Sequence, residues 1–199
     1  MSQLTAQFEN YLKALWSAEE WGRVATNGSL AQALGLAPSS VTESVRKLVA
    51  AGLLTHQPYG EVTLTDEGRR VAAGVVRKHR LVETFLVEWL GYGWDEVHEE
   101  AEVLEHAVSD AFAERLSERL GRPERDPHGD PIPRADGSVP IGDEVPLEEV
   151  DAGTRVRIVR VSDSSPGLLA ELDAAGLRVG DELVVGERAF VPGIRVLPV

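Results

Sequence analysis

The stretch from Ser29 to Leu54 reads SLAQALGLAPSSVTESVRKLVAAGLL, and it decides the fold of the first part of the chain. Ser29 is expected to be the N-cap of a short helix, LAQAL, which Gly35 ends. Pro38 suits the start of a second helix, because its missing N–H is not needed in the first turn. A short helix, a glycine turn and a second helix with small hydroxyl residues at its exposed start are typical of a helix-turn-helix. The expected buried stripe of the second helix is Val41, Val45, Leu48 and Val49.

The segments on either side complete a winged helix. Leu4–Trp16 carries apolar residues at helical spacing, and Leu53–Thr65 alternates around a Pro-Tyr-Gly turn, which predicts a two-stranded hairpin. Small polar side chains can enter a DNA major groove, and arginine or lysine can reach phosphates or base edges. A winged helix that binds protein instead of DNA stays open as an alternative. The predicted DNA contacts are Ser39, Ser40, Thr42, Glu43, Arg46 and Lys47 in the second helix and Tyr59 in the wing.

A second informative stretch, His79–His106, reads HRLVETFLVEWLGYGWDEVHEEAEVLEH. It holds three of the five histidines and a dense run of carboxylates, with no lysine among them. Spacings of three and four residues place these groups on common helix faces, which predicts ligands for a divalent cation. The alternative is a solvated acidic helix face. The spacings relate His79 to Glu83, His98 to Glu102, and Glu102 to Glu105 and His106.

Two long helices are expected in this region. Asp66 is expected to cap a helix that runs to Leu90, where Gly91-Tyr92-Gly93 ends it. Its apolar positions over residues 75–90 cover more than one face, which suggests a subunit interface. Asp95 is expected to cap a helix that Gly121 ends. The expected core stripe of this helix is Val97, Ala101, Leu104, Val108 and Phe112.

The remainder is richer in turns and strands. Residues 126–133, DPHGDPIP, are expected to form an ordered turn that a linker follows. From Thr154 to Val199, the segments RVRIVRV, GDELVV and GIRVLPV predict strands, and SSPGLLAELDAAG predicts a short helix. These form a small SH3-like β module with nothing that looks catalytic. The fold class is therefore mainly α with small β, with predicted domains 1–76, 77–144 and 145–199.

Composition limits the classes of function. The net charge of −13 argues at first against nucleic acid, but residues 1–78 carry eight basic and seven acidic side chains, so the acidity lies downstream. No apolar run approaches about 18 residues and no signal peptide is recognisable, so we expect a cytoplasmic protein that does not bind membranes. Cysteine is absent and the only methionine is the first residue. A metal site must therefore use nitrogen and oxygen ligands, which suit Mn²⁺ or Fe²⁺ better than copper(I) or structural zinc.

Several motifs carry a family resemblance. In order, VTESVRKLVAAGLL, LTDEGRRVA, RKHRLVETFLVEWLG, WDEVHEEAEVLEHAVSD and DPHGDPIP resemble the diphtheria-toxin-repressor family of metal-dependent transcription regulators, in its manganese-type branch. The resemblance covers the whole chain, including a FeoA-like C-terminal module. It implies a homodimer that binds a palindromic operator in double-stranded DNA when loaded with metal, and that represses metal-uptake genes.

The resemblance also implies two metal sites per subunit, for Mn²⁺ or Fe²⁺. Glu102 stands where iron-sensing members have cysteine, and a carboxylate in place of a soft sulfur favours a harder cation. An iron(II)-dependent regulator of the same kind stays open. The implied primary site is Asn10, Glu102, Glu105 and His106. The implied second site is His79, Glu83 and His98, with Asp126, His128 and Asp163 from the proline-rich turn and the C-terminal module.

Two rival classes remain. A di-metal carboxylate enzyme would need two Glu-x-x-His motifs, which the chain does not contain, and it has no HExxH motif. We therefore expect no enzymatic activity and no small-molecule substrate. A metal-independent winged-helix regulator is the other rival. Substitution of Glu105 or His106 separates them, because a sensor loses metal-dependent DNA binding, an enzyme loses turnover and a metal-independent regulator loses neither.

Overall fold

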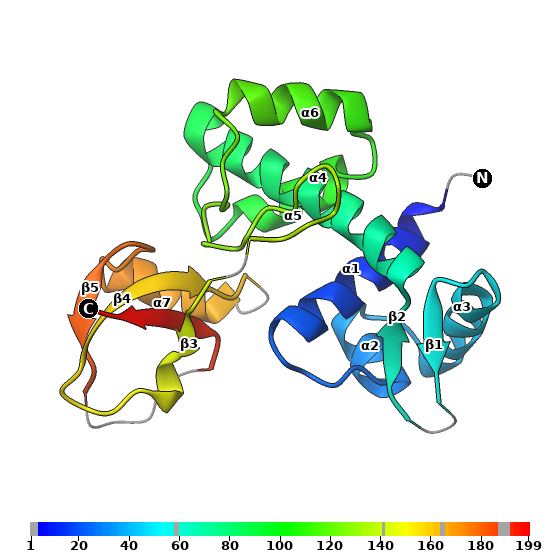
Figure 1. Ribbon diagram of the computed structural model, residues 1–199, viewed down its shortest axis with the longest axis horizontal. Helices are drawn as coiled ribbons and strands as arrows, with labels where there is room; N and C mark the ends of the chain where they lie inside the picture. Colours follow the sequence, from blue (N-terminus) through cyan, green and yellow to red (C-terminus); the bar gives the residue numbers. More distant parts are fainter. Residues whose placement is uncertain (1–3, 58–59, 141, 164–165, 187–191) are drawn as a thin grey trace. The chain divides into compact units, whose positions relative to one another are not determined.

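The computed structural model describes residues 4–57, 60–140, 142–163, 166–186 and 192–199 (Figure 1). The chain divides into two compact units: residues 1–78 with 133–138, and residues 79–132 with 139–199. Helices predominate and the two sheets are small, which confirms the predicted fold class. The predicted three-domain boundaries stay a prediction. Among the described residues, no helix has the length and apolar character needed to cross a membrane.

The first unit is a winged helix-turn-helix. Gly35, at φ 63°, ends the first helix of the motif, and Pro38 begins the second, as predicted. The wing is an antiparallel pair of strands in which Leu54 faces Leu64. The elements are α1 (Ala6–Glu20), α2 (Asn27–Ala33), α3 (Pro38–Ala50), β1 (Leu54–His56), β2 (Val62–Leu64) and the start of α4 (Asp66–Leu90).

Three local predictions in this unit are wrong. Thr26, not Ser29, caps α2, because the Thr26 hydroxyl accepts from the Ser29 N–H while the Ser29 hydroxyl accepts from the Thr26 N–H. Thr65, not Asp66, caps α4, since its hydroxyl accepts from the N–H of Gly68 at 3.0 Å. Val49 is 38% exposed, and Ser44 takes its place in the buried stripe of α3 because positions 41, 44, 45 and 48 share one helix face.

The helical part of the second unit contains the rest of α4, α5 (Val97–Leu104) and α6 (Asp110–Arg119). Gly91, at φ 75°, follows the end of α4 as predicted. The single helix predicted from Asp95 to Gly121 is wrong, because the Ser109 hydroxyl accepts from the Phe112 N–H and starts a new helix there. The expected stripe is correspondingly split: Val97 and Ala101 are buried, Leu104 and Val108 are partly buried, and Phe112 is 54% exposed.

The C-terminal part of this unit is the SH3-like module. Its antiparallel sheet has the order β3-β6-β4-β5, and leucines of α7 pack in the core with Val156 and Ile158 of β4. Trp94, which precedes α5, belongs to the same core. The elements are β3 (Val145–Pro146), a 3-10 turn (Leu147–Glu149), β4 (Arg155–Val161), α7 (Pro166–Ala174), β5 (Glu182–Val184) and β6 (Ile194–Pro198).

The proline-rich turn is ordered, as predicted, and it packs tightly on β4. The N–H of Val161 donates to the carbonyl of His128 at 2.9 Å. Gly129 has φ 83°, and a Cβ at this position would lie 2.0 Å from the carbonyl oxygen of Val159. Only glycine fits there, because both the backbone conformation and the close approach exclude a side chain. The turn therefore holds its polar residues at a fixed place beside β4.

Candidate metal centre

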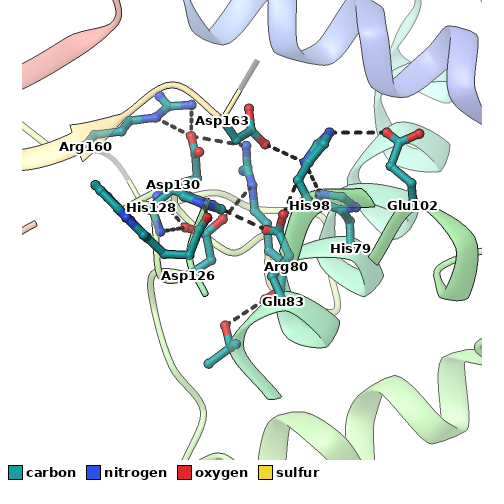
Figure 2. Close-up of polar contacts among 12 residues, drawn as sticks. His79, Arg80, Glu83, His98, Glu102, Asp126, His128, Asp130, Arg160 and Asp163 are labelled. Carbon is teal, nitrogen blue, oxygen red and sulfur yellow. Dashed lines mark hydrogen bonds and ion pairs between the residues drawn. The ribbon is translucent and has the colours of Figure 1, made fainter. Parts of the chain in front are cut away.

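Residues distant in sequence converge in the second unit (Figure 2). His79 and Glu83 lie one turn apart on α4, His98 lies on α5, and the turn and the segment after β4 supply the rest. Their ligating atoms form two groups, each with all atoms within 4.8 Å of one another. The first group is His79, Glu83, His98 and Asp163, and the second is Glu83, Asp126 and His128.

The first group is built around one buried carboxylate oxygen. Glu83 Oε1 lies 2.9 Å from His79 Nε2 and 3.2 Å from His98 Nδ1. The same nitrogen of His98 lies 3.2 Å from Asp163 Oδ2. Two carboxylates and two imidazoles therefore face a common point, which is a ligand set that a divalent cation of intermediate hardness accepts.

In the absence of a cation, a proton links these groups. Burial favours neutral His98, but hydrogen bonds and negative charge from Asp163 and Glu83 outweigh it and raise the pKa of His98 to about 10. Burial likewise opposes ionisation of Asp163, yet the hydrogen bond from His98 lowers the pKa of Asp163 to about 2. Burial also opposes ionisation of Glu83, and the charge of His79 holds the pKa of Glu83 well below its usual range. At neutral pH the group is two carboxylates held together by positively charged imidazole groups, His98 among them.

The second group is a set of buried polar atoms. Glu83 Oε2, Asp126 Oδ2 and His128 Nδ1 are buried and have no hydrogen-bond partner. His128 Nε2 lies 2.6 Å from the carbonyl oxygen of Trp94, so Nε2 carries the proton and Nδ1 presents its lone pair. His128 Nδ1 lies 3.8 Å from Glu83 Oε2. Buried polar atoms without a hydrogen-bond partner are costly, and a bound cation would satisfy all three.

Two arginines compensate the negative charge around the turn. Asp126 Oδ1 accepts from the N–H groups of His128 and Asp130, both at 2.9 Å, which leaves Oδ2 for the second group. Arg80 lies with Nε 3.6 Å from Asp126 Oδ2 and Nη2 3.5 Å from Asp130 Oδ1. Arg160 of β4 also contacts Asp130 Oδ1. Burial and the charge of Asp130 nevertheless raise the pKa of Asp126 well above its usual range.

Sequence reasoning missed Arg80, Asp130 and Arg160. All three are buried, which is rare for charged residues unless they are paired. The pair of aspartates four residues apart in the ordered turn was the one local signal for this network. Nothing local in the sequence indicates that Arg160, 30 residues beyond Asp130, is its partner.

The residues predicted for the primary site lie outside both groups and make other contacts. Glu105 is buried, with Oε2 2.5 Å from His79 Nδ1 and Oε1 3.3 Å from His106 Nε2. Glu102 Oε1 lies 3.5 Å from His98 Nε2. Among the described residues, neither group of converging atoms includes Glu102, Glu105 or His106. Asn10 lies on α1 in the first unit, where its side-chain oxygen is buried without a hydrogen-bond partner.

The predicted DNA contacts of the second helix lie on one face of α3. Thr42 accepts from the side chain of Asn27 at 3.4 Å and donates to the carbonyl of Pro38 at 2.9 Å, so its hydroxyl ties the two helices of the motif together. Tyr59 lies outside the described residues. The exposed predicted contacts are Ser39, Ser40, Thr42, Glu43, Arg46 and Lys47.

Comparisons with known proteins identify each part of the chain. Residues 3–62 match the iron dependent repressor N-terminal DNA binding domain, and residues 65–134 match the iron dependent repressor metal binding and dimerisation domain. Residues 145–197 match the FeoA domain.

Whole-chain relatives agree with these matches. The iron-dependent repressor IdeR of Mycobacterium tuberculosis is 35% identical over 166 residues, which cover 83% of this chain and 70% of that protein. The diphtheria toxin repressor of Corynebacterium efficiens is 33% identical over 205 residues, which cover 96% of this chain and 88% of that repressor.

Solved structures agree as well. A manganese-dependent transcriptional repressor in complex with manganese is 42% identical, with a TM-score of 0.89, and the match covers 96% of this chain and 100% of that one. The manganese regulator SloR is 31% identical, with a TM-score of 0.81, and the match covers 98% of this chain and 100% of that one. These proteins are regulators and not enzymes, and the matched domains bind DNA and dimerise. This chain therefore belongs to the diphtheria-toxin-repressor (iron-dependent repressor) family of metal-dependent, DNA-binding transcriptional regulators.

Proposed function

We propose that the protein is a manganese-dependent repressor, which binds a palindromic operator as a metal-loaded homodimer and represses metal-uptake genes. The observation that carries the proposal is the buried, cysteine-free ligand set around Glu83, in which three side-chain atoms lack a hydrogen-bond partner. Nitrogen and oxygen ligands of this kind suit Mn²⁺. The similarity to a manganese-dependent repressor solved with manganese supports the same metal.

Two metal sites per subunit follow from this proposal. In the second site, Glu83 would serve both groups, since its two oxygens face different partners. In the primary site, the buried side-chain oxygen of Asn10 would join carboxylates and an imidazole. The second-site ligands are His79, Glu83, His98, Asp126, His128 and Asp163, and the primary-site ligands are Asn10, Glu102, Glu105 and His106.

The primary site couples metal to DNA. When bound, the metal supplies the positive charge that offsets repulsion among the carboxylates. Asn10 lies on α1 of the DNA-binding unit, and Glu102 lies on α5 of the other. Joining them would fix the separation of the two recognition helices of a dimer, so that both half-sites are met without a further ordering cost. A coupling free energy of about 1–3 kcal/mol would change operator affinity roughly 5–150-fold.

The homodimer interface is proposed to lie on the helical part of the second unit. Large apolar side chains are exposed on all three of its helices, and a homodimer interface would bury them. The guanidinium of Arg119 lies 4.4 Å from the ring centre of Trp89 and covers part of this surface. The exposed apolar residues are Trp89, Leu90, Val103 and Phe112.

DNA binding measured by fluorescence anisotropy tests the proposal. The DNA is the promoter upstream of the protein's own gene or of a metal-transporter gene, and metal-free protein is titrated first, then protein with Mn²⁺, anaerobic Fe²⁺ or Zn²⁺. We expect Mn²⁺ to tighten binding about tenfold or more. Glu105→Gln should abolish this gain, whereas Glu99→Gln, the same change at an exposed position of α5, should leave it intact. Equal binding with and without every metal would overturn the proposal.

Iron(II) is the second candidate, because Fe²⁺ accepts the same nitrogen and oxygen ligands. The relatives include iron-dependent as well as manganese-dependent repressors. The Mn²⁺ and Fe²⁺ titrations of the anisotropy experiment separate the two metals. Tighter DNA binding with Fe²⁺, at concentrations where Mn²⁺ has no effect, would assign the protein to iron.

A further inference from the structure

The exposed face of α3 carries one carboxylate among residues suited to DNA. Glu43 is the only acidic residue within Pro38–Ala50, and Arg46 and Lys47, three and four residues further on, lie on the same face. A surface that approaches phosphates disfavours negative charge. A carboxylate there costs binding energy for any DNA, unless it accepts a hydrogen bond from a base. Such a hydrogen bond would need a donor on the edge of a base.

Glu43 is held as an ionised acceptor beside a donor. Its Oε1 lies 2.7 Å from Lys47 Nζ, and both side chains are 57% exposed. The hydrogen bond and the charge of Lys47 lower the pKa of Glu43. The opposite face of α3 is fixed in the core by Val41, Val45 and Leu48. The helix thus presents an acceptor and a donor side by side from a rigid support.

The major-groove edge of a C·G pair has the complementary pattern. Cytosine presents the N4 amino group as a donor, and guanine presents O6 and N7 as acceptors. Adenine also has an amino donor, but its N7 acceptor lies beside it and repels a carboxylate, and thymine presents an acceptor and a methyl group. Among the four bases, cytosine is therefore the one that a carboxylate reads best.

We propose that Glu43 determines operator specificity by accepting a hydrogen bond from the N4 amino group of a cytosine in each half-site, while Lys47 donates to guanine of the same or the adjacent pair. This inference rests on the proposed function, because it needs the metal-loaded protein to bind DNA. Glu43 lies in the N-terminal half of α3, and the N-terminal residues of a recognition helix are those that contact base edges.

Selection from a randomised DNA library tests the proposal, using Mn²⁺-loaded full-length protein. The wild type should select a C·G pair at one position of each half-site. Glu43→Ala, which removes the acceptor oxygens as well as the charge, should lose that preference by about tenfold and keep the preferences at other positions. Glu67→Ala is the matched control, because it removes the same side chain from another exposed acid–base pair, with Arg70 on α4. The control should select the same sequences as the wild type.

Direct titrations complete the test. Changing the selected C·G pair to T·A should weaken wild-type binding about tenfold and weaken the binding of Glu43→Ala much less. Identical selected sequences for wild type and Glu43→Ala would overturn the inference, as would a uniform change in affinity with no change in base preference. If the wild type bound DNA but selected no cytosine, the inference alone would fail. If the wild type selected no DNA at all, the proposed function itself would fail.

Discussion

Arg160→Met should destabilise the second unit strongly. Arg160 is 3% exposed and Asp130 is 2% exposed, and the arginine contacts the aspartate through Nε and Nη2. Removing one partner of a buried ion pair costs about 3–5 kcal/mol, because the other charge stays buried. Arg80 Nη2 remains 3.5 Å from Asp130, so we expect the lower end of that range, about 3 kcal/mol. For a chain of this size, this loss corresponds to a fall in Tm of about 6–12 °C.

The assay is thermal unfolding of metal-free protein in the presence of a chelator. The matched control is Arg157→Met, the same change on the same strand, where Arg157 Nη2 lies 2.8 Å from Glu182 Oε1 and is 49% exposed. Exposed ion pairs contribute little, so the control should unfold close to the wild type. The double variant Arg160→Met/Asp130→Leu should recover most of the stability, since no buried charge is left without its partner. Equal losses for Arg160→Met and Arg157→Met, or a double variant as unstable as the single one, would refute this reasoning.

Three further predictions concern the turn and the second site. His128→Ala should weaken Mn²⁺ binding at the second site by at least about tenfold, as measured by calorimetric titration. One site per subunit should then bind Mn²⁺ more tightly than this weakened site. Because the pKa of His98 is raised to about 10, His98 is protonated at neutral pH and the cation must displace that proton. Apparent affinity should therefore rise between pH 7 and pH 9, with at least about one proton released per second-site cation at pH 7.5, as read with an indicator dye; no proton release would contradict the assignment of His98. Gly129→Ala should lower stability by about 1–3 kcal/mol more than Gly153→Ala in denaturant titrations, because both glycines have positive φ but only Gly129 meets the carbonyl of Val159; equal losses would show that backbone strain alone is responsible.

The parts of the fold that depend on local spacing could be predicted from the sequence. The helix-turn-helix follows from Gly35 and Pro38 together with the apolar period of α3, and the end of α4 follows from Gly91. Helix starts were predicted wrongly where two residues close in sequence could each serve as the N-cap. Thr26 and Ser29 form a reciprocal capping box, which periodicity alone does not distinguish from a single cap. The apolar period also continues past Ser109, although a new helix, α6, begins there.

The metal centre was only partly predictable for a different reason. The spacing of His79 and Glu83 places them on one face of a helix, so their convergence is a local property. Asp163 and His128 entered only through the family resemblance, because their proximity to Glu83 depends on how β4 and the turn pack. The pairing of Arg160 with Asp130 depends on the same packing and carries no periodic signal.

The turn at residues 126–130 would couple metal binding at the proposed second site to docking of the β module. The same residue, His128, presents Nδ1 to Glu83 and accepts from the N–H of Val161 through its carbonyl oxygen. Asp163 follows Val161 by two residues and contacts His98, so any shift of the end of β4 moves a ligand of the first group. Arg160, the residue before Val161, anchors that end to Asp130. A variant that releases this anchor should therefore lose second-site affinity for Mn²⁺ together with stability, although Arg160 is not itself a ligand.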